Sequence, residues 1–62
     1  MLTTREKEIV ALVALGYSNK EMAARLGISH HTVARHMAQI FEKLAVHERT
    51  SVAVYAVKQR IA

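Results

Sequence analysis

Residues 18–44 read SNKEMAARLGISHHTVARHMAQIFEKL, and this stretch predicts two helices joined by a very short turn. Only Gly27, Ile28 and Ser29 separate the two helical patterns. Helices joined by so tight a turn cannot lie antiparallel and must cross steeply, as in a helix-turn-helix. The stretch therefore predicts a helix-turn-helix, and the remaining residues have to supply the core on which it rests.

Three residues at the predicted crossing have the properties that the crossing needs. Ala23 is small at the point where the second of the two helices approaches, and Gly27 tolerates a positive φ in the turn. Val33 is apolar and can lock the two helices together. The combination favours a helix-turn-helix, although a short helical hairpin in a bundle can match it by accident.

Capping residues predict where the helices begin and end. Thr3 with Glu6, and Ser18 with Glu21, have the spacing of a capping box, so each pair opens a helix. Gly16 can take the left-handed conformation that ends a helix. With the apolar spacing, these signals predict helices over residues 4–15, 19–26, 30–44 and 49–60.

The third of these helices has the clearest apolar pattern. Spacings of 4, 3 and 4 form one stripe of a helix: Val33, Met37, Ile40 and Leu44. Ala45 then stands where a glycine would end the helix more easily, because a left-handed conformation costs a non-glycine residue about 1 kcal/mol. We expect Val46 to fold back over the end of this helix.

The composition is typical of a helical domain. With 62 residues the chain can form one domain at most, and it has no cysteine for a disulfide or a thiolate metal site. Apolar residues make up 52 %, aromatic residues only 5 %, and proline is absent. We therefore expect residues 1–62 to form an all-α domain of four helices around one core.

The sequence has no feature of a membrane protein. The longest apolar-leaning stretch, residues 9–15, has 7 residues, whereas a membrane span needs roughly 20. Nothing resembles a signal peptide, and the absence of cysteine fits the reducing cytosol. We expect a cytoplasmic protein with no membrane partner.

The net charge of +4 at pH 7 leans toward an anionic partner, of which nucleic acid is the commonest. Many small domains carry such a charge for solubility alone, and the basic residues here are spread along the chain rather than gathered in a tail. The position of the basic side chains therefore has to decide whether the charge serves nucleic-acid binding or solubility.

A polar face lies opposite the apolar stripe of the third helix when residues are projected at about 100° each. It consists of His31, Arg35, Ala38 and Glu42, flanked by Ala34 and Gln39. A recognition helix reads base edges with its N-terminal part, and arginine most often binds the O6 and N7 acceptors of guanine. We therefore predict that Arg35 is the central base contact.

Four other residues of this face are predicted to support Arg35 in reading bases. Gln39 has the paired donor and acceptor that suit adenine, and His31 lies near the start of the helix. Ala34 and Ala38 are small enough to let the helix sink into a groove, and their methyl groups could meet a thymine methyl. The alternative is a solvated, mixed-charge helix surface. The exposed alanines do not favour this alternative, because they add no polar group to such a surface.

A second set of residues is predicted to contact phosphates, which position a protein on DNA without specifying sequence. Thr32, His36 and Lys43 share one side of the third helix, and Lys20 lies at the start of the second. His36 could instead pack at the edge of the core. Protonation would strengthen any histidine–phosphate contact, so binding should be modestly tighter at pH 6 than at pH 8.

At this point the chain resembles the LuxR-type helix-turn-helix domain, also called the NarL/FixJ effector domain, of bacterial transcription regulators. LTTREKE at 2–8 resembles the family's LTxRExE opening, GYSNKEMA at 16–23 its GxSNKEIA segment, LGIS at 26–29 its turn, TVARH at 32–36 its TVKxH segment, and KLAV at 43–46 with RT at 49–50 its KLGV…RT ending. No gap is needed, and the combined motifs are highly specific.

The resemblance implies a four-helix domain that binds double-stranded DNA as a dimer, with its third helix in the major groove. It also implies an upstream receiver or sensing domain, so we expect the chain to be a piece of a longer regulator, with RNA polymerase as a further partner to consider. The family commonly has lysine where this chain has Ala34, and a polar or basic residue at Ala38. Its usual base contacts therefore cannot be transferred to this chain.

Family members often meet through the fourth helix, and here that helix has a second apolar stripe. Val54, Val57 and Ile61 lie on the side away from the predicted core, where a four-helix domain has nothing to cover them. Exposed apolar stripes favour self-association, so we predict a homodimer through these residues. The alternative is a set of isolated surface apolar residues.

Other roles are less well supported. The histidines form no i, i+4 pair on one helix face, and no aspartate or glycine-rich phosphate loop is present, so we predict no metal, cofactor or catalytic site. We expect Glu8 and Arg49 to form an ion pair between the first and fourth helices, a phosphate contact for Arg49 being the alternative. The competing classes are the promoter-reading region of a sigma factor and a helical protein-interaction module.

Overall fold

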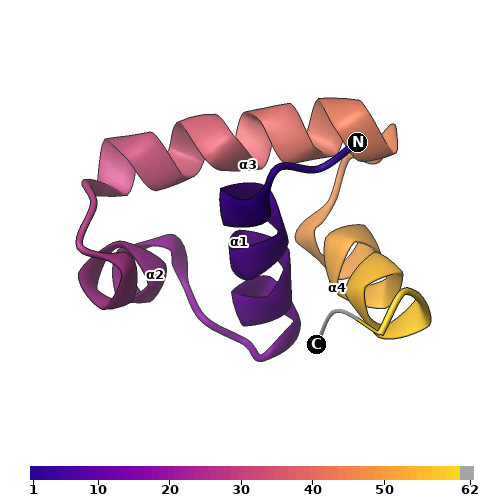
Figure 1. Ribbon diagram of the computed structural model, residues 1–62, viewed down its shortest axis with the longest axis horizontal. Coiled ribbons are helices and arrows are strands. Elements are labelled where there is room, and N and C mark those ends of the chain that lie inside the picture. Colours follow the sequence, from indigo (N-terminus) through magenta and orange to yellow (C-terminus); the bar gives the residue numbers. More distant parts are fainter. Residues whose placement is uncertain (61–62) are drawn as a thin grey trace.

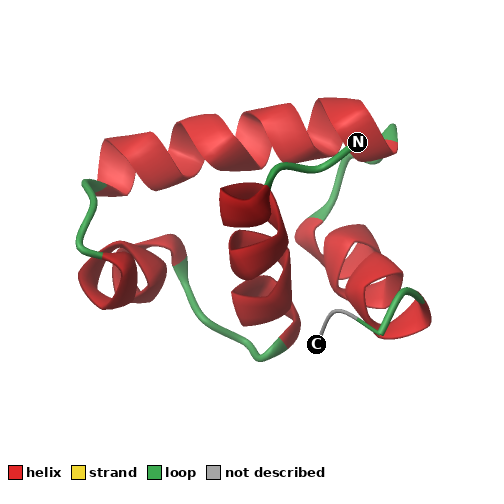
Figure 2. Ribbon diagram, viewed as in Figure 1, coloured by secondary structure: helices red, strands yellow, loops and turns green. Residues whose placement is uncertain are grey.

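The computed structural model describes residues 1–60, and these residues form four helices joined by loops (Figure 2). The helices are α1 (Thr4–Ala14), α2 (Asn19–Leu26), α3 (His30–Leu44) and α4 (Arg49–Lys58). The predicted all-α fold is confirmed for these residues. Helices α1 and α4 end one and two residues earlier than predicted, because Leu15 and Gln59 are their C-caps rather than helical residues.

Helix α3 lies across the other three helices (Figure 1). Helix α2 lies beside its N-terminal half, α1 beneath its middle and α4 beneath its C-terminal half (Figure 1). Helix α1 packs against both α3 and α4, while α2 packs against α3. The arrangement leaves one long side of α3 facing away from the rest of the domain.

All four helices contribute to a single core. Its buried apolar residues are Leu2, Ile9, Val10, Val13, Met22, Ala23, Val33, Met37, Ile40, Val52 and Ala56. Three of the four residues in the predicted α3 stripe are among them, whereas Leu44 is half-buried because the last turn of α3 lies at the edge of the domain. The 3.6-residue pattern therefore identified the inner side of α3 correctly.

Helices α1, α2 and α3 end in the same way. A residue with positive φ follows each helix: Gly16 at 92°, Gly27 at 69° and Ala45 at 55°. The next residue, Tyr17, Ile28 or Val46 respectively, donates its N–H to the carbonyl of Leu12, Ala23 or Phe41 at 3.0–3.1 Å and packs on the core. This is a Schellman ending with its apolar contact. It confirms the left-handed conformation predicted at Ala45 and the return of Val46 over the end of α3.

The capping box at the start of α1 contains a buried carboxylate. Glu6 is only 2 % exposed, and its Oε1 accepts the backbone N–H of Thr3 at 2.8 Å. The same oxygen accepts a hydrogen bond from Nζ of Lys43 at 2.7 Å, and Nζ also donates to the carbonyl of Met1 at 3.2 Å. The first turn of α1 is therefore tied to the last turn of α3.

Candidate nucleic-acid interface

The turn between α2 and α3 has the chemistry that the crossing requires. Ala23 is 8 % exposed and Val33 is fully buried, and Gly27 takes the left-handed conformation with φ 69° and ψ 31°. Ile28 is half-buried and packs against the core. The predicted helix-turn-helix is therefore present, with α2 and α3 as its two helices.

The five predicted base-reading residues are all exposed, and α3 carries every one of them: His31, Ala34, Arg35, Ala38 and Gln39. They lie on the side of α3 opposite its buried stripe, which is the side turned away from the other helices (Figure 1). The exposed alanines keep the surface of the helix low beside the long side chains of Arg35 and Gln39. Such a surface can approach a groove closely.

The N-terminus of α3 is capped by Ser29 and is exposed to solvent. Oγ of Ser29 accepts the backbone N–H of Thr32 at 3.0 Å and lies 2.8 Å from its Oγ1. Thr32 is half-buried and His31 is exposed. The amides of the first helical residues have no intrahelical partner, so this end of α3 carries partial positive charge suited to an anion.

The four predicted phosphate contacts differ in their surroundings. Lys20 is exposed in the first turn of α2, and Thr32 lies at the start of α3. His36 is half-buried; among residues 1–60 its Nδ1 is buried without a hydrogen-bond partner, which leaves Nε2 as the nitrogen able to meet a phosphate. Lys43 donates to Glu6 and Met1, so a phosphate contact would compete with an internal ion pair.

Glu6 was predicted from the sequence as part of a capping box, but its burial and its ion pair with Lys43 were not predicted. The hydrogen bond from Lys43, followed by that from the backbone of Thr3, lowers the pKa of the Glu6 carboxyl, although burial acts in the opposite direction. A signal was present, because Glu6 precedes Ile9, Val10 and Val13 by three, four and seven residues. That spacing places the carboxylate on the buried stripe of α1.

The predicted ion pair between Glu8 and Arg49 is wrong. Glu8 instead lies 3.6 Å from Nε of Arg5 one turn away on α1. Arg49 donates to Oδ1 of Asn19 at 2.7 Å and to the carbonyl oxygen of Tyr17 at 2.8 Å. Arg49 therefore connects α4 to the segment that leads into α2, because the start of α4 lies beside that segment rather than beside Glu8.

The outer side of α4 carries exposed apolar residues, as the sequence predicts. Val54 is 47 % exposed and Val57 is 67 % exposed. Both line a shallow groove of about 330 Å³ whose other lining residues are Thr50, Ala53 and Lys58. Ile61, the third residue of the predicted dimer surface, lies outside the described residues.

Residues 1–60 contain neither a metal-binding cluster nor a membrane-spanning helix. No three side chains among His, Cys, Asp and Glu come together there in a way that could hold a metal ion. No helix in that range has the length and apolarity needed to cross a membrane.

Comparison with known proteins identifies the family. Residues 1–56 match the family described as bacterial regulatory proteins, luxR family. The response regulator protein VraR of Staphylococcus aureus is 44 % identical over 61 residues, which cover 98 % of this chain and 29 % of that protein. The VraR proteins of Staphylococcus saprophyticus and Staphylococcus epidermidis match to the same extent. The chain thus spans less than a third of the length of these relatives.

A solved structure shares the fold. The crystal structure of the response regulator ChrA, in a heme-sensing two-component system, superposes with a TM-score of 0.90 at 40 % identity. The match covers 100 % of this chain and 31 % of that chain. The resemblance recognised in the sequence motifs is thereby confirmed. The chain belongs to the LuxR family of bacterial regulatory proteins, as a helix-turn-helix DNA-binding domain of transcription regulators.

Proposed function

We propose that the domain binds specific duplex sequences by placing α3 in the major groove. The observation that carries this proposal is the outer side of α3, where Arg35 stands between the exposed Ala34 and Ala38 with no acidic residue before Glu42. A helix that reads bases needs a low surface, a donor for guanine and no charge that phosphates repel over its N-terminal half. Arg35 is the central reader, and His31 and Gln39 lie on either side of it.

Phosphate contacts would come from Lys20, Thr32 and His36, together with the open amides at the start of α3. Lys20 supports this assignment, because it is exposed and a lysine in the first turn of a helix opposes the helix dipole. A nearby phosphate would compensate for that position. Lys43 stays a predicted phosphate contact that has to compete with Glu6.

The domain binds paired half-sites as a two-fold dimer in this proposal. The apolar groove on α4 supports it, because Val54 and Val57 expose apolar surface that a second copy of α4 would cover. Each copy would then present one α3 to one half-site, so the two half-sites should be related by two-fold symmetry.

The relatives suggest what the rest of the protein does. VraR and ChrA are response regulators, and the chain matches only 29–31 % of their length. We propose that a receiver or sensing domain controls this DNA-binding domain in the complete regulator. Contact with RNA polymerase is a further proposal that the same relationship suggests.

Selection of bound sequences from random duplexes tests the proposal, since it reports the motif, its symmetry and the half-site spacing together. The selected duplex should then bind more tightly than a scrambled one in fluorescence polarisation, with an affinity that falls as salt rises because phosphate contacts release counterions. Lys7→Ala is the matched control, because Lys7 is an exposed cation on α1 that is not among the proposed DNA contacts. Failure to enrich any motif, together with equal affinity for selected and scrambled duplexes, would refute the proposal.

A further inference from the structure

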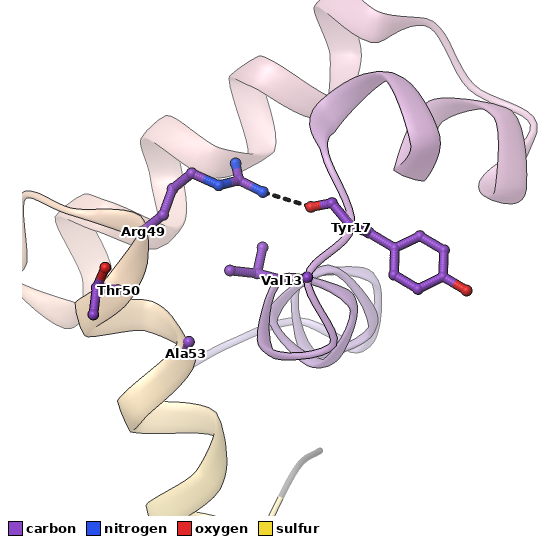
Figure 3. Close-up of a pocket in the computed structure, with 6 residues that line it drawn as sticks. Val13, Tyr17, Arg49, Thr50 and Ala53 are labelled. Atoms are coloured by element: carbon purple, nitrogen blue, oxygen red, sulfur yellow. Dashed lines mark hydrogen bonds between the residues drawn. The ribbon is translucent and has the colours of Figure 1, made fainter.

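Arg49 is the first residue of α4, and it forms two hydrogen bonds that leave that helix. Figure 3 shows its side chain reaching from the start of α4 across a small pocket to the carbonyl oxygen of Tyr17. That bond is 2.8 Å long, and the second, to Oδ1 of Asn19, is 2.7 Å long. Within residues 1–60, no other side-chain hydrogen bond joins α4 to another part of the domain.

Both acceptors belong to the entrance of the helix-turn-helix. Asn19 is the first residue of α2, and Tyr17 precedes it by two residues. The ring of Tyr17 points away from α4 (Figure 3) and lies 5.4 Å from the guanidinium of Arg25 near the end of α2. Tyr17 is therefore held by Arg49 through its backbone and by α2 through its ring.

The packing of the helices makes the Arg49 contact a direct connection between α4 and the α2–α3 unit. Helix α4 packs mainly on α1 and only lightly on α3, whereas α2 packs on α3. Without Arg49, α4 would therefore communicate with the α2–α3 unit chiefly through α1. The guanidinium adds a direct connection, and its planar fork can satisfy both acceptors in one fixed geometry.

We propose that Arg49 is a positioning residue, which fixes the orientation of α4 relative to the α2–α3 unit and so sets the separation of the two α3 helices in the DNA-bound dimer. The inference rests on the proposed function, because it concerns how a dimer formed through α4 fits two half-sites. Two reading helices in the same dimer gain affinity from each other only if their spacing matches that of the half-sites.

The fold itself does not depend on this contact. Arg49 is exposed, while Val52 and Ala56 of the same helix are fully buried in the core and hold α4 in place. Loss of the guanidinium should therefore widen the range of orientations of α4 without unfolding it. A phosphate contact of Arg49 is the competing explanation, and it makes different predictions for salt and for isolated half-sites.

The test compares Arg49→Ala, Arg49→Lys and Asn19→Ala with the control Lys7→Ala in the full chain, using duplexes with one selected half-site and with two at a series of spacings. Arg49→Ala should keep affinity for one half-site within about twofold but weaken binding to the optimal pair about tenfold, with reduced dependence on spacing. Arg49→Lys should restore little of the affinity for paired half-sites, since an ammonium cannot replace the planar fork of the guanidinium. Asn19→Ala should weaken pair binding less, and should add nothing to Arg49→Ala because the two residues share one contact.

A phosphate contact would appear as an equal loss on one and two half-sites, with the salt slope reduced by about one, and that result would overturn the proposal. Unchanged pair binding and spacing preference in Arg49→Ala would also overturn it. A second readout needs no DNA: residual dipolar couplings should report a changed or broader orientation of α4 relative to α2 in Arg49→Ala. Couplings identical to those of the wild type would refute the positioning role, whereas failure of every variant and the wild type to bind any duplex would refute the proposed function instead.

Discussion

Replacement of Lys43 by methionine tests the ion pair between α1 and α3 most directly. Methionine keeps most of the apolar stem of lysine and removes only its charge and its hydrogen bonds. Glu6 would then keep the amide hydrogen bond from Thr3 but lose the cation 2.7 Å away, while staying 2 % exposed. A buried carboxylate would be left without its counter-charge.

The size of the effect follows from the exposure of the two partners. Removal of one partner from a fully buried pair costs about 3–5 kcal/mol. The side chain of Lys43 is 35 % exposed, so water already screens the pair and can reach the carboxylate in the variant, and we expect a loss of about 2 kcal/mol. In a domain of this size, that corresponds to a fall in melting temperature of about 8–16 °C.

The pH dependence of stability should become weaker in Lys43→Met. In the wild type the pKa of Glu6 is lowered from its ordinary value of 4.5, so its contribution is present above pH 4.5 and is lost as the pH falls through the lowered value. Without Lys43, the hydrogen bonds with Thr3 should still lower the pKa of Glu6, but by less because burial opposes them, so a smaller contribution is lost as the pH falls. The deficit of Lys43→Met should therefore be largest at neutral pH and shrink on acidification.

Thermal unfolding followed by circular dichroism from pH 4 to pH 7 measures both effects. Lys7→Met, an exposed lysine on α1, is the control and should change stability by less than about 0.5 kcal/mol. Glu6→Gln should cost only about 1 kcal/mol, because glutamine preserves the capping box and Lys43 can reach water. A melting temperature for Lys43→Met within about 2 °C of the wild type at pH 7 would refute the reasoning.

The same variant separates the structural role of Lys43 from its predicted phosphate contact. A phosphate contact would weaken binding to all sequences alike and reduce the salt slope by about one. Measured below the melting range of the variant, an unchanged slope would assign Lys43 to the ion pair alone.

Three further substitutions test other parts of the structure. Arg35→Ala should cost about 1–3 kcal/mol in binding and relax one base position in a repeated selection; an unchanged motif would contradict its reading role. Val57→Glu should abolish cooperative binding to paired half-sites in gel shifts while sparing a single half-site, and retained cooperativity would exclude this dimer surface. Ala45→Gly should raise the melting temperature by up to about 4–8 °C, because it relieves a non-glycine residue at φ 55° that costs about 1 kcal/mol; no increase would show that the conformation is not strained.

The local sequence predicted most of the fold because the interactions concerned span only a few residues. The capping box at Ser18 joins residues three apart, and the hydrogen bonds that close the chain reversals at Gly27 and Ala45 join residues five apart. The apolar stripe of α3 has the same short range, since helical geometry alone places its members on one side. These features do not depend on where the other helices lie.

In the candidate site, too, the local features could be predicted from the sequence and the long-range pairings could not. The exposure of Arg35 and its neighbours followed from the stripe, because the outer side of α3 is the complement of the inner one. The partners of Lys43 and Arg49 did not follow: Lys43 bonds a residue 37 positions away, and Arg49 bonds residues 30 and 32 positions away. No local pattern encodes such a pairing.

Local sequence patterns were therefore sufficient to predict the four helices, most of their ends, the helix-turn-helix and the outer side of α3. The packing of the helices was needed to show that the carboxylate of Glu6 is buried against Lys43, and that Arg49 bonds the entrance of α2 and not Glu8. The physical reason is that backbone conformation responds to neighbours within about one turn. The partner of a long charged side chain, in contrast, depends on which helix ends the packing of the core brings together.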